Sequence, residues 1–250
     1  MPTFSSDGLD LAYVEEGQGD PILLIHGFAS TKEVNWINTS WFKTLTGDGR
    51  RVIAFDHRGH GGSAKLYDPN QYDTRLMAKD ALRLLEHLRL QRADIMGYSM
   101  GARVTAQMAL LYPEAVRSAI MGGLGIHLVD SIGLPTSIAE ALEAPSLDDV
   151  TDPMGRMFRA FSDANKADLK ALAACIRGSR QILTREQVGE IRVPALVAVG
   201  TRDTIAGDPH ALAALLPKGE ALDIPNRDHN PAVGDKVFKQ AVLEFLARRP

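Results

Sequence analysis

The sequence predicts an α/β protein with one mostly parallel central sheet flanked by helices. Short apolar runs alternate along the chain with stretches of helical apolar spacing, which is the order of a parallel sheet covered by helices. The apolar runs show little polar alternation, so most strands are expected to be covered on both faces. A chain of 250 residues is long enough to bury a full core without a disulfide or a metal.

The strands are expected in the following order. An alternating segment, 9–15, follows Asp7-Gly8 and predicts an N-terminal strand or hairpin. Six largely apolar runs come next, and each is followed directly by Gly, Asp or Pro, which are typical turn residues. These six expected strands are 21–26, 52–55, 93–96, 116–121, 195–199 and 221–224.

Helices are expected between these runs at 74–89, 100–111 and 235–248, where apolar residues recur with a helical period. The stretch 124–191 is far longer than one crossover requires, and a structureless loop of that length is improbable in a compact domain. It contains several prolines and short helical patterns. The sequence therefore predicts a core of 1–123 and 192–250 with a small helical insertion, 124–191, over one edge of the sheet.

Composition excludes several classes of protein. Hydrophobic residues are 45% and charged residues 24% of the chain, which is typical of a globular protein and excludes a disordered one. Lys and Arg number 28 against 31 Asp and Glu, so the basic surface that nucleic acid requires is not expected. A single cysteine, Cys175, excludes an internal disulfide and a multi-cysteine zinc site. No signal peptide or membrane helix is apparent, so a cytoplasmic protein is expected.

A nucleophile motif lies between the expected strand 93–96 and the expected helix 100–111. Gly97-Tyr98-Ser99-Met100-Gly101 matches G-x-S-x-G in the strand–turn–helix context that the motif requires. In that context Ser99 lies in a strained turn with its hydroxyl exposed. Gly97 and Gly101 carry no side chain, which lets strand and helix approach closely. Ser99 is therefore the candidate nucleophile.

A serine hydroxyl needs a neighbouring base, which is typically a histidine held by a carboxylate. Enzymes with a serine at such a turn carry the acid and then the histidine later in the chain. Asp203 follows the run 195–199, and His229 follows the run 221–224. Both come just after the carboxyl end of an expected strand, which is the edge where open α/β sheets bind ligands. Asp203 and His229 are therefore the candidate acid and base.

An oxyanion hole requires two backbone N–H donors near the nucleophile. One is expected from Met100, the residue after the nucleophile. The other is expected from Phe28, because His26-Gly27-Phe28 ends the earlier run 21–26 and begins the loop after it.

These motifs together resemble the α/β-hydrolase family over nearly the whole chain. The resemblance rests on His-Gly-Phe at 26–28, D-x-R-G-x-G-x-S at 56–63, G-x-S-x-G at 97–101, G-x-x-D at 200–203 and the late His229. It implies the α/β-hydrolase fold, the serine machinery, a structural loop at 56–63 and a cap at the helical insertion. Many members carry Gly directly before the catalytic histidine, whereas this chain has Asp228, a second carboxylate that competes with Asp203 as the partner of the histidine.

Several residues are weighed as pocket or ligand residues. His57 and His60 beside Asp56 have a spacing that a metal site also shows, but within this glycine-rich loop they are interpreted as structural, and no metal is expected. No Glu or Arg cluster in the insertion marks a diacid or a free amine. Aromatic and methionine side chains of the insertion and loops are interpreted as core or as pocket lining. The expected pocket residues are Tyr98, Trp36, Met154, Met157, Phe158 and Phe161.

The sequence thus predicts a serine hydrolase that cleaves a small or medium carboxylic ester through an acyl-enzyme, with no cofactor. The resemblance leaves open carbon–carbon bond (meta-cleavage-type), enol-lactone and thioester hydrolysis, some aminopeptidases, and a cofactor-free perhydrolase on the same triad. Relatives that open epoxides or cleave carbon–halogen bonds carry Asp where this chain has Ser99, which disfavours those reactions. A ligand-binding receptor on the same scaffold is the alternative from another class.

Overall fold

The structure, a computed structural model, describes residues 1–131 and 133–248. Eight strands form one sheet in the order β1-β2-β4-β3-β5-β6-β7-β8, in which β1, β2 and β4 are joined by antiparallel pairing and the strands from β4 to β8 run parallel. The predicted fold class is confirmed. The strands are β1 Thr3–Ser6, β2 Leu9–Glu16, β3 Asp20–Ile25, β4 Arg50–Phe55, β5 Ala93–Tyr98, β6 Val116–Gly122, β7 Ala195–Gly200 and β8 Gly219–Ile224.

The apolar runs form the central strands of the sheet. Apolar residues are favoured there because both faces of the sheet are covered. Every residue of β5 and of β7 is buried, as expected for parallel strands between two layers of helices. The predicted run 93–96 extends to Tyr98, because the ladder with β6 continues as far as Tyr98 opposite Gly122. This extension carries β5 up to the residue before Ser99.

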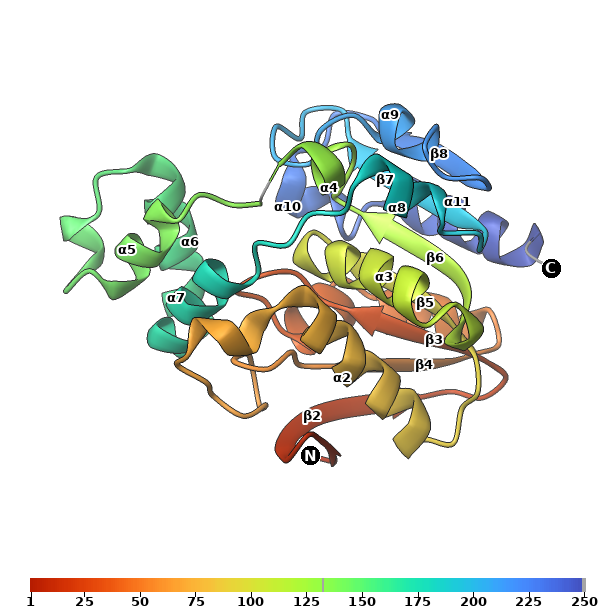
Figure 1. The fold of residues 1–250 in the computed structure, drawn as a ribbon, viewed down its shortest axis with the longest axis horizontal. Helices are drawn as coiled ribbons and strands as arrows, with labels where there is room; N and C mark the ends of the chain where they lie inside the picture. The colour runs from red at the N-terminus through yellow and green to blue at the C-terminus, as the bar shows by residue number, and fades with distance from the viewer. Residues whose placement is uncertain (132, 249–250) are drawn as a thin grey trace.

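Helices cover the two faces of the sheet (Figure 1). The predicted helices form as α2, α3 and α11, whereas α1, α9 and α10 have too few residues to show a helical period in the sequence. Side chains of α2 and α3 belong to the core on one face, and those of α1 and α11 belong to the core on the other. These helices are α1 Trp41–Gly47, α2 Thr74–His87, α3 Met100–Leu111, α9 Pro209–Ala213, α10 His229–Ala232 and α11 Lys236–Arg248.

Five α-helices lie in the described part of the long segment between β6 and β7. Helix α5 packs against both α6 and α7 to one side of the sheet, whereas α8 packs near α3 (Figure 1). The boundaries 124 and 191 stay a prediction. Residue 132 of the expected insertion and residues 249–250 of the expected core lie outside the described residues. The helices are α4 His127–Asp130, α5 Ser137–Glu143, α6 Pro153–Ala164, α7 Leu169–Gly178 and α8 Arg185–Gly189.

No helix in the described ranges combines the length and the apolar character that crossing a lipid bilayer requires.

Candidate active site

Ser99 lies in the sharp turn between β5 and α3, with φ 55° and ψ −113°. A positive φ is unfavourable for a residue with a side chain and is typical of strained functional turns. A Cβ at Gly97 would collide with the carbonyl oxygen of Gly101, and one at Gly101 would collide with the carbonyl oxygen of Ile25. The two glycines therefore permit the close strand–helix approach expected from the motif.

The structure brings the three predicted side chains into one hydrogen-bonded chain. His229 Nδ1 is 2.7 Å from Asp203 Oδ2, and His229 Nε2 is 2.9 Å from Ser99 Oγ. A carboxylate only accepts, so the Nδ1–H of His229 donates to Asp203, and Nε2 is left to accept from the Ser99 hydroxyl. Loops after β5, β7 and β8 supply these residues, so the parallel sheet places all three at one edge.

The competition between Asp203 and Asp228 is decided by position. The carboxylate of Asp203 is fully buried, and its second oxygen, Oδ1, accepts from the backbone N–H of Ile205 at 2.8 Å and of Ala206 at 3.1 Å. Asp228 is exposed, and its side chain makes no capping hydrogen bond at the start of α10. Asp203 is therefore the carboxylate that orients His229.

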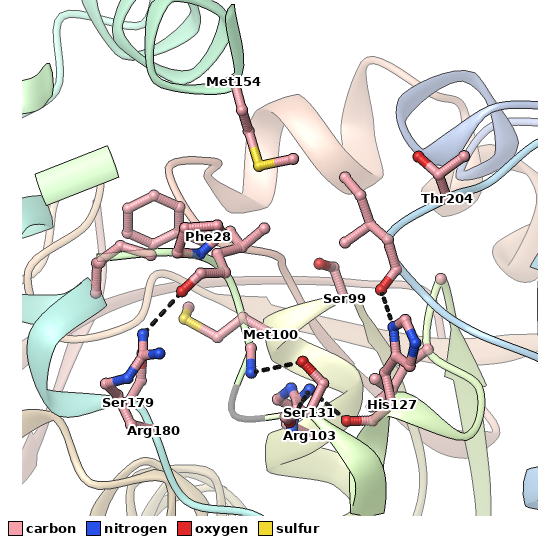
Figure 2. Close-up of a pocket in the computed structure, with 17 residues that line it drawn as sticks. Phe28, Ser99, Met100, Arg103, His127, Ser131, Met154, Ser179, Arg180 and Thr204 are labelled. Carbon is pink, nitrogen blue, oxygen red and sulfur yellow. Dashed lines mark hydrogen bonds between the residues drawn. The ribbon is translucent and has the colours of Figure 1, made fainter. Parts of the chain in front are cut away.

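Two backbone donors lie beside Ser99. Met100 is the first residue of α3, where no intrahelical acceptor exists for its N–H, and the helix dipole favours negative charge there. Within the described part of the chain, the Phe28 N–H makes no hydrogen bond. Phe28, Ser99 and Met100 all line the same cavity (Figure 2).

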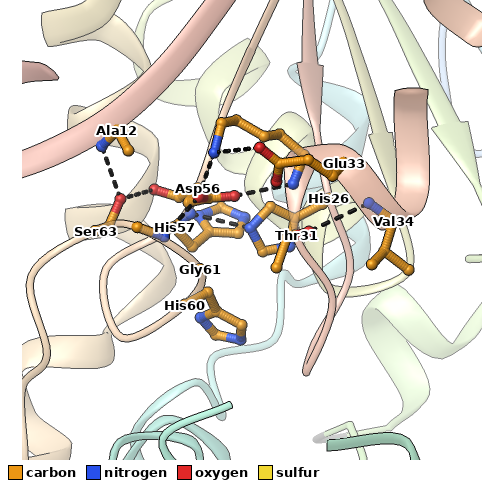
Figure 3. A network of polar contacts seen from close by, with 12 residues as sticks. Ala12, His26, Thr31, Glu33, Val34, Asp56, His57, His60, Gly61 and Ser63 are labelled. Carbon is orange, nitrogen blue, oxygen red and sulfur yellow. Dashed lines mark hydrogen bonds and ion pairs between the residues drawn. The ribbon is translucent and has the colours of Figure 1, made fainter. Parts of the chain in front are cut away.

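Two buried histidine rings, those of His26 and His60, support the loop that carries Phe28 (Figure 3). The backbone N–H of His57 donates to Nε2 of the His26 ring at 3.0 Å. The proton of the His26 ring is therefore on Nδ1, which donates to the Gly27 carbonyl at 2.7 Å. The Ala29 N–H likewise donates to His60 Nε2 at 3.2 Å. Both rings act here in their neutral form, which agrees with the structural interpretation of this loop.

Asp56 ties the same loop to β4. Its carboxylate accepts from the Lys32 ammonium at 2.6 Å, from the Lys32 N–H at 2.9 Å and from the Gly62 N–H at 2.8 Å, and both side chains of the ion pair are buried. The Ser63 hydroxyl donates to the Asp56 carbonyl at 2.6 Å (Figure 3). Within the described residues, no group of three or more His, Cys, Asp or Glu side chains is placed to hold a metal ion.

The buried histidines predict a loss of stability in mild acid. Burial, with the nearby His26 as a second cause, lowers the pKa of His60 from 6.5 to about 3. Between these two pH values the unfolded chain binds a proton that the folded chain does not, so stability falls as pH falls below 6.5. For His60 alone we expect a loss of about 2 kcal/mol between pH 7 and pH 5.

Urea unfolding at pH 7 and pH 5 measures this loss, and His60→Gln is the comparison. The variant should be less stable at pH 7 but should show a smaller difference between the two pH values. An equal difference in both proteins would contradict the role of His60.

Two cavities of about 210 Å³ each flank Ser99. The first is lined by Met154 and by both backbone donors. The second is lined by His229 and by four of the expected pocket residues, Tyr98, Met157, Phe158 and Phe161. Trp36 lines neither cavity. Its indole is fully buried and packs edge-on against Trp41 at 6.3 Å between ring centroids, so Trp36 is a core residue.

The structure also places two arginines in the first cavity that sequence reasoning did not identify. Arg103 lies in the first turn of α3, four residues after Ser99, and this closeness in sequence to the nucleophile was a readable signal. Arg180 follows α7 at the end of the helical insertion, and nothing in its local sequence marks it. The expectation that the insertion itself carries no arginine cluster stays a prediction, because only Arg180 comes from the insertion and tertiary folding brings it to the same cavity as Arg103 of the core.

Comparisons with known proteins agree with the fold of the chain. The model of a family described as having the alpha/beta hydrolase fold matches residues 20–152. The chain is 31% identical to the dihydrolipoyllysine-residue acetyltransferase component of an acetoin cleaving system from Pseudomonas putida, with 92% of this chain but only 64% of that protein covered. It is 26% identical to the non-heme chloroperoxidase CPO-A1 of Kitasatospora aureofaciens, covering 96% of this chain and 97% of that one. The solved enol-lactonase of Burkholderia xenovorans LB400 superimposes with a TM-score of 0.80 at 20% identity, covering 99% and 100% of the two chains.

Proposed function

The chain belongs to the α/β-hydrolase family, and from that premise we propose that it is a serine hydrolase that cleaves small or medium carboxylic esters. The observation that carries the proposal is the hydrogen-bonded chain from Ser99 through His229 to Asp203, which ends at a cavity lined by two backbone donors. This arrangement has every part that acyl transfer to a serine requires.

The reaction follows from the donors and acceptors. His229 Nε2 takes the hydroxyl proton as Ser99 Oγ bonds to the ester carbonyl carbon, while Asp203 stabilises the resulting imidazolium. The Phe28 and Met100 N–H groups stabilise the oxyanion. The carbon–oxygen bond to the alcohol then breaks, and the alcohol leaves with the proton from His229. Water, deprotonated by His229, attacks the acyl-enzyme and releases the acid and free Ser99.

The likeness to the chloroperoxidase favours a second activity on the same acyl-enzyme. Hydrogen peroxide in place of water would attack the acyl carbon, with His229 taking its proton, and would release a peracid and free Ser99. The protein would then be a cofactor-free perhydrolase. Peracid formation from an ester and hydrogen peroxide, measured beside hydrolysis of the same ester, tests this second activity.

Hydrolysis of p-nitrophenyl esters from C2 to C12 tests the proposed function, together with labelling by an organophosphonate ester. We expect hydrolysis to be fastest for short or medium acyl chains, and one equivalent of phosphonate to be found on the peptide that contains Ser99. A tightly bound small ligand with negligible turnover and no labelling would contradict the proposal and favour a receptor on this scaffold.

A further inference from the structure

Two arginine side chains converge on the cavity beside Ser99. Arg103 comes from α3 and Arg180 from the segment after α7, and both line the first cavity together with Phe28 and Met100 (Figure 2). The described residues that line this cavity include no Asp or Glu. Neither arginine takes part in an ion pair with a described residue, whereas many other arginines of the chain do.

Arg103 is buried but incompletely bonded. Only 8% of the residue is exposed. Its Nη2 donates to the carbonyl oxygens of His127 at 2.7 Å and of Ser131 at 3.0 Å, which holds the guanidinium in place. Its Nη1 is buried and has no hydrogen-bond partner within the described part of the chain. A buried donor without a partner is costly, so this nitrogen points to a ligand atom that the folded chain does not supply.

Arg180 adds a second positive charge to the same space. It is half-buried, and its Nη1 donates to the Leu134 carbonyl at 2.8 Å. Burial, and secondly the proximity of Arg180, lower the pKa of Arg103 to about 10, so Arg103 stays protonated at neutral pH. Among the described residues, the hydrogen bonds of these two neighbouring guanidinium groups go to backbone carbonyls and neither group has an ion pair, so their positive charge is not compensated by a carboxylate there. A planar carboxylate would compensate this charge and satisfy the open donor with charge-assisted hydrogen bonds.

The position of His229 assigns this cavity to one side of the scissile bond. In the proposed function, His229 must give its proton to the leaving alcohol, and His229 lines the second cavity but not the first. The first cavity therefore holds the acyl part. Arg103 lies in the first turn of α3, and its backbone N–H donates to the Ser99 carbonyl at 3.2 Å. Because Ser99 and Arg103 also line one cavity of about 210 Å³, only a short chain fits between the ester carbonyl and the anion.

We propose that the substrate is a monoester of a short dicarboxylic acid, whose free carboxylate binds Arg103 and Arg180 in the first cavity. This inference rests on the proposed function, because it names the substrate class of the same site. The proposed function names small or medium carboxylic esters in general, and this inference narrows them to esters whose acyl group carries a negative charge.

The first experiment compares kcat/KM for charged and neutral esters of the same length. Ethanol release is measured from monoethyl succinate, glutarate and adipate, and from ethyl butyrate, pentanoate and hexanoate. We expect one of the monoesters to be preferred over its neutral partner by about 10- to 100-fold, which is typical of a buried charge-assisted pair. Equal values for every pair would overturn the inference. A preference for esters with the carboxylate on the alcohol, such as acetoxyacetate, would also overturn it.

Two variants assign the effect to the arginines. Arg180→Gln and Arg103→Lys should lower the ratio of charged to neutral kcat/KM by about tenfold or more, mainly through KM of the charged ester. Arg192 is exposed and lines neither cavity, so Arg192→Gln is the matched control and should leave the ratio unchanged. An unchanged ratio in both cavity variants would overturn the assignment.

Calorimetric binding of free glutarate to Ser99→Ala protein separates this inference from the proposed function. If Arg180→Gln abolishes glutarate binding but the wild-type protein cleaves none of the esters, the anion site stands and the proposed hydrolase is refuted. Ester hydrolysis with no charge preference and no glutarate binding would refute the anion site alone.

Discussion

Replacing Ser99 by alanine is expected to lower kcat for ester hydrolysis by a factor on the order of 10⁶, the loss typical of removing a serine nucleophile. His229 Nε2, 2.9 Å from Ser99 Oγ, would then have no hydroxyl to deprotonate. The cavity and the backbone donors remain, so a small residual rate over water is expected. Steady-state hydrolysis of the best p-nitrophenyl ester in the chain-length series measures the loss.

The alanine variant is a clean comparison because it retains Cβ. Ser99 has φ 55°, and alanine keeps the strain of that backbone, so the midpoint of thermal unfolding should change little. Ser5 is exposed on β1, far from the site in sequence, and Ser5→Ala is the matched control that should keep full activity. Substantial hydrolysis by a folded Ser99→Ala protein would show that another group is the nucleophile.

Asp203→Asn is expected to lower kcat by a factor of about 10⁴ while the fold is retained. The carboxylate of Asp203 accepts the Nδ1–H of His229 at 2.7 Å, which leaves Nε2 free to act as the base. A neutral amide can donate to Nδ1 and so stabilise the wrong tautomer, and it no longer stabilises the imidazolium. The rate at saturating ester measures this loss.

Asp228→Asn is the matched control, because it makes the same chemical change one residue before His229. Asp228 is exposed and makes no capping hydrogen bond, so its variant should keep the wild-type kcat to within about threefold. If Asp228→Asn lost the activity and Asp203→Asn kept it, the assignment of the acid would be reversed.

Local sequence patterns predicted those strands and turns whose conformation depends on residues that are close in sequence. Largely apolar runs predicted β5 and β7, because a strand covered on both faces favours apolar residues at most positions. The G-x-S-x-G pattern predicted the turn at Ser99, because only glycines permit the contacts that Gly97 and Gly101 make. Helices such as α9 and α10 were not predicted, since one turn of helix carries no readable period.

Long-range packing decided the rest. Trp36 has the residue type of a pocket wall, but its place against Trp41 makes it core. Arg103 and Arg180 are separated by much of the insertion, and no spacing rule relates them until α3 and the segment after α7 converge on one cavity.

The sequence by itself determined the parallel sheet, the strained serine and the order of the three candidate catalytic residues, because these follow from apolar runs, glycines and strand ends. Only the tertiary structure decided which carboxylate contacts His229 and which cationic groups face the serine. Those choices depend on distances of a few ångströms between segments far apart in the chain, and such distances exist only once the layers have packed.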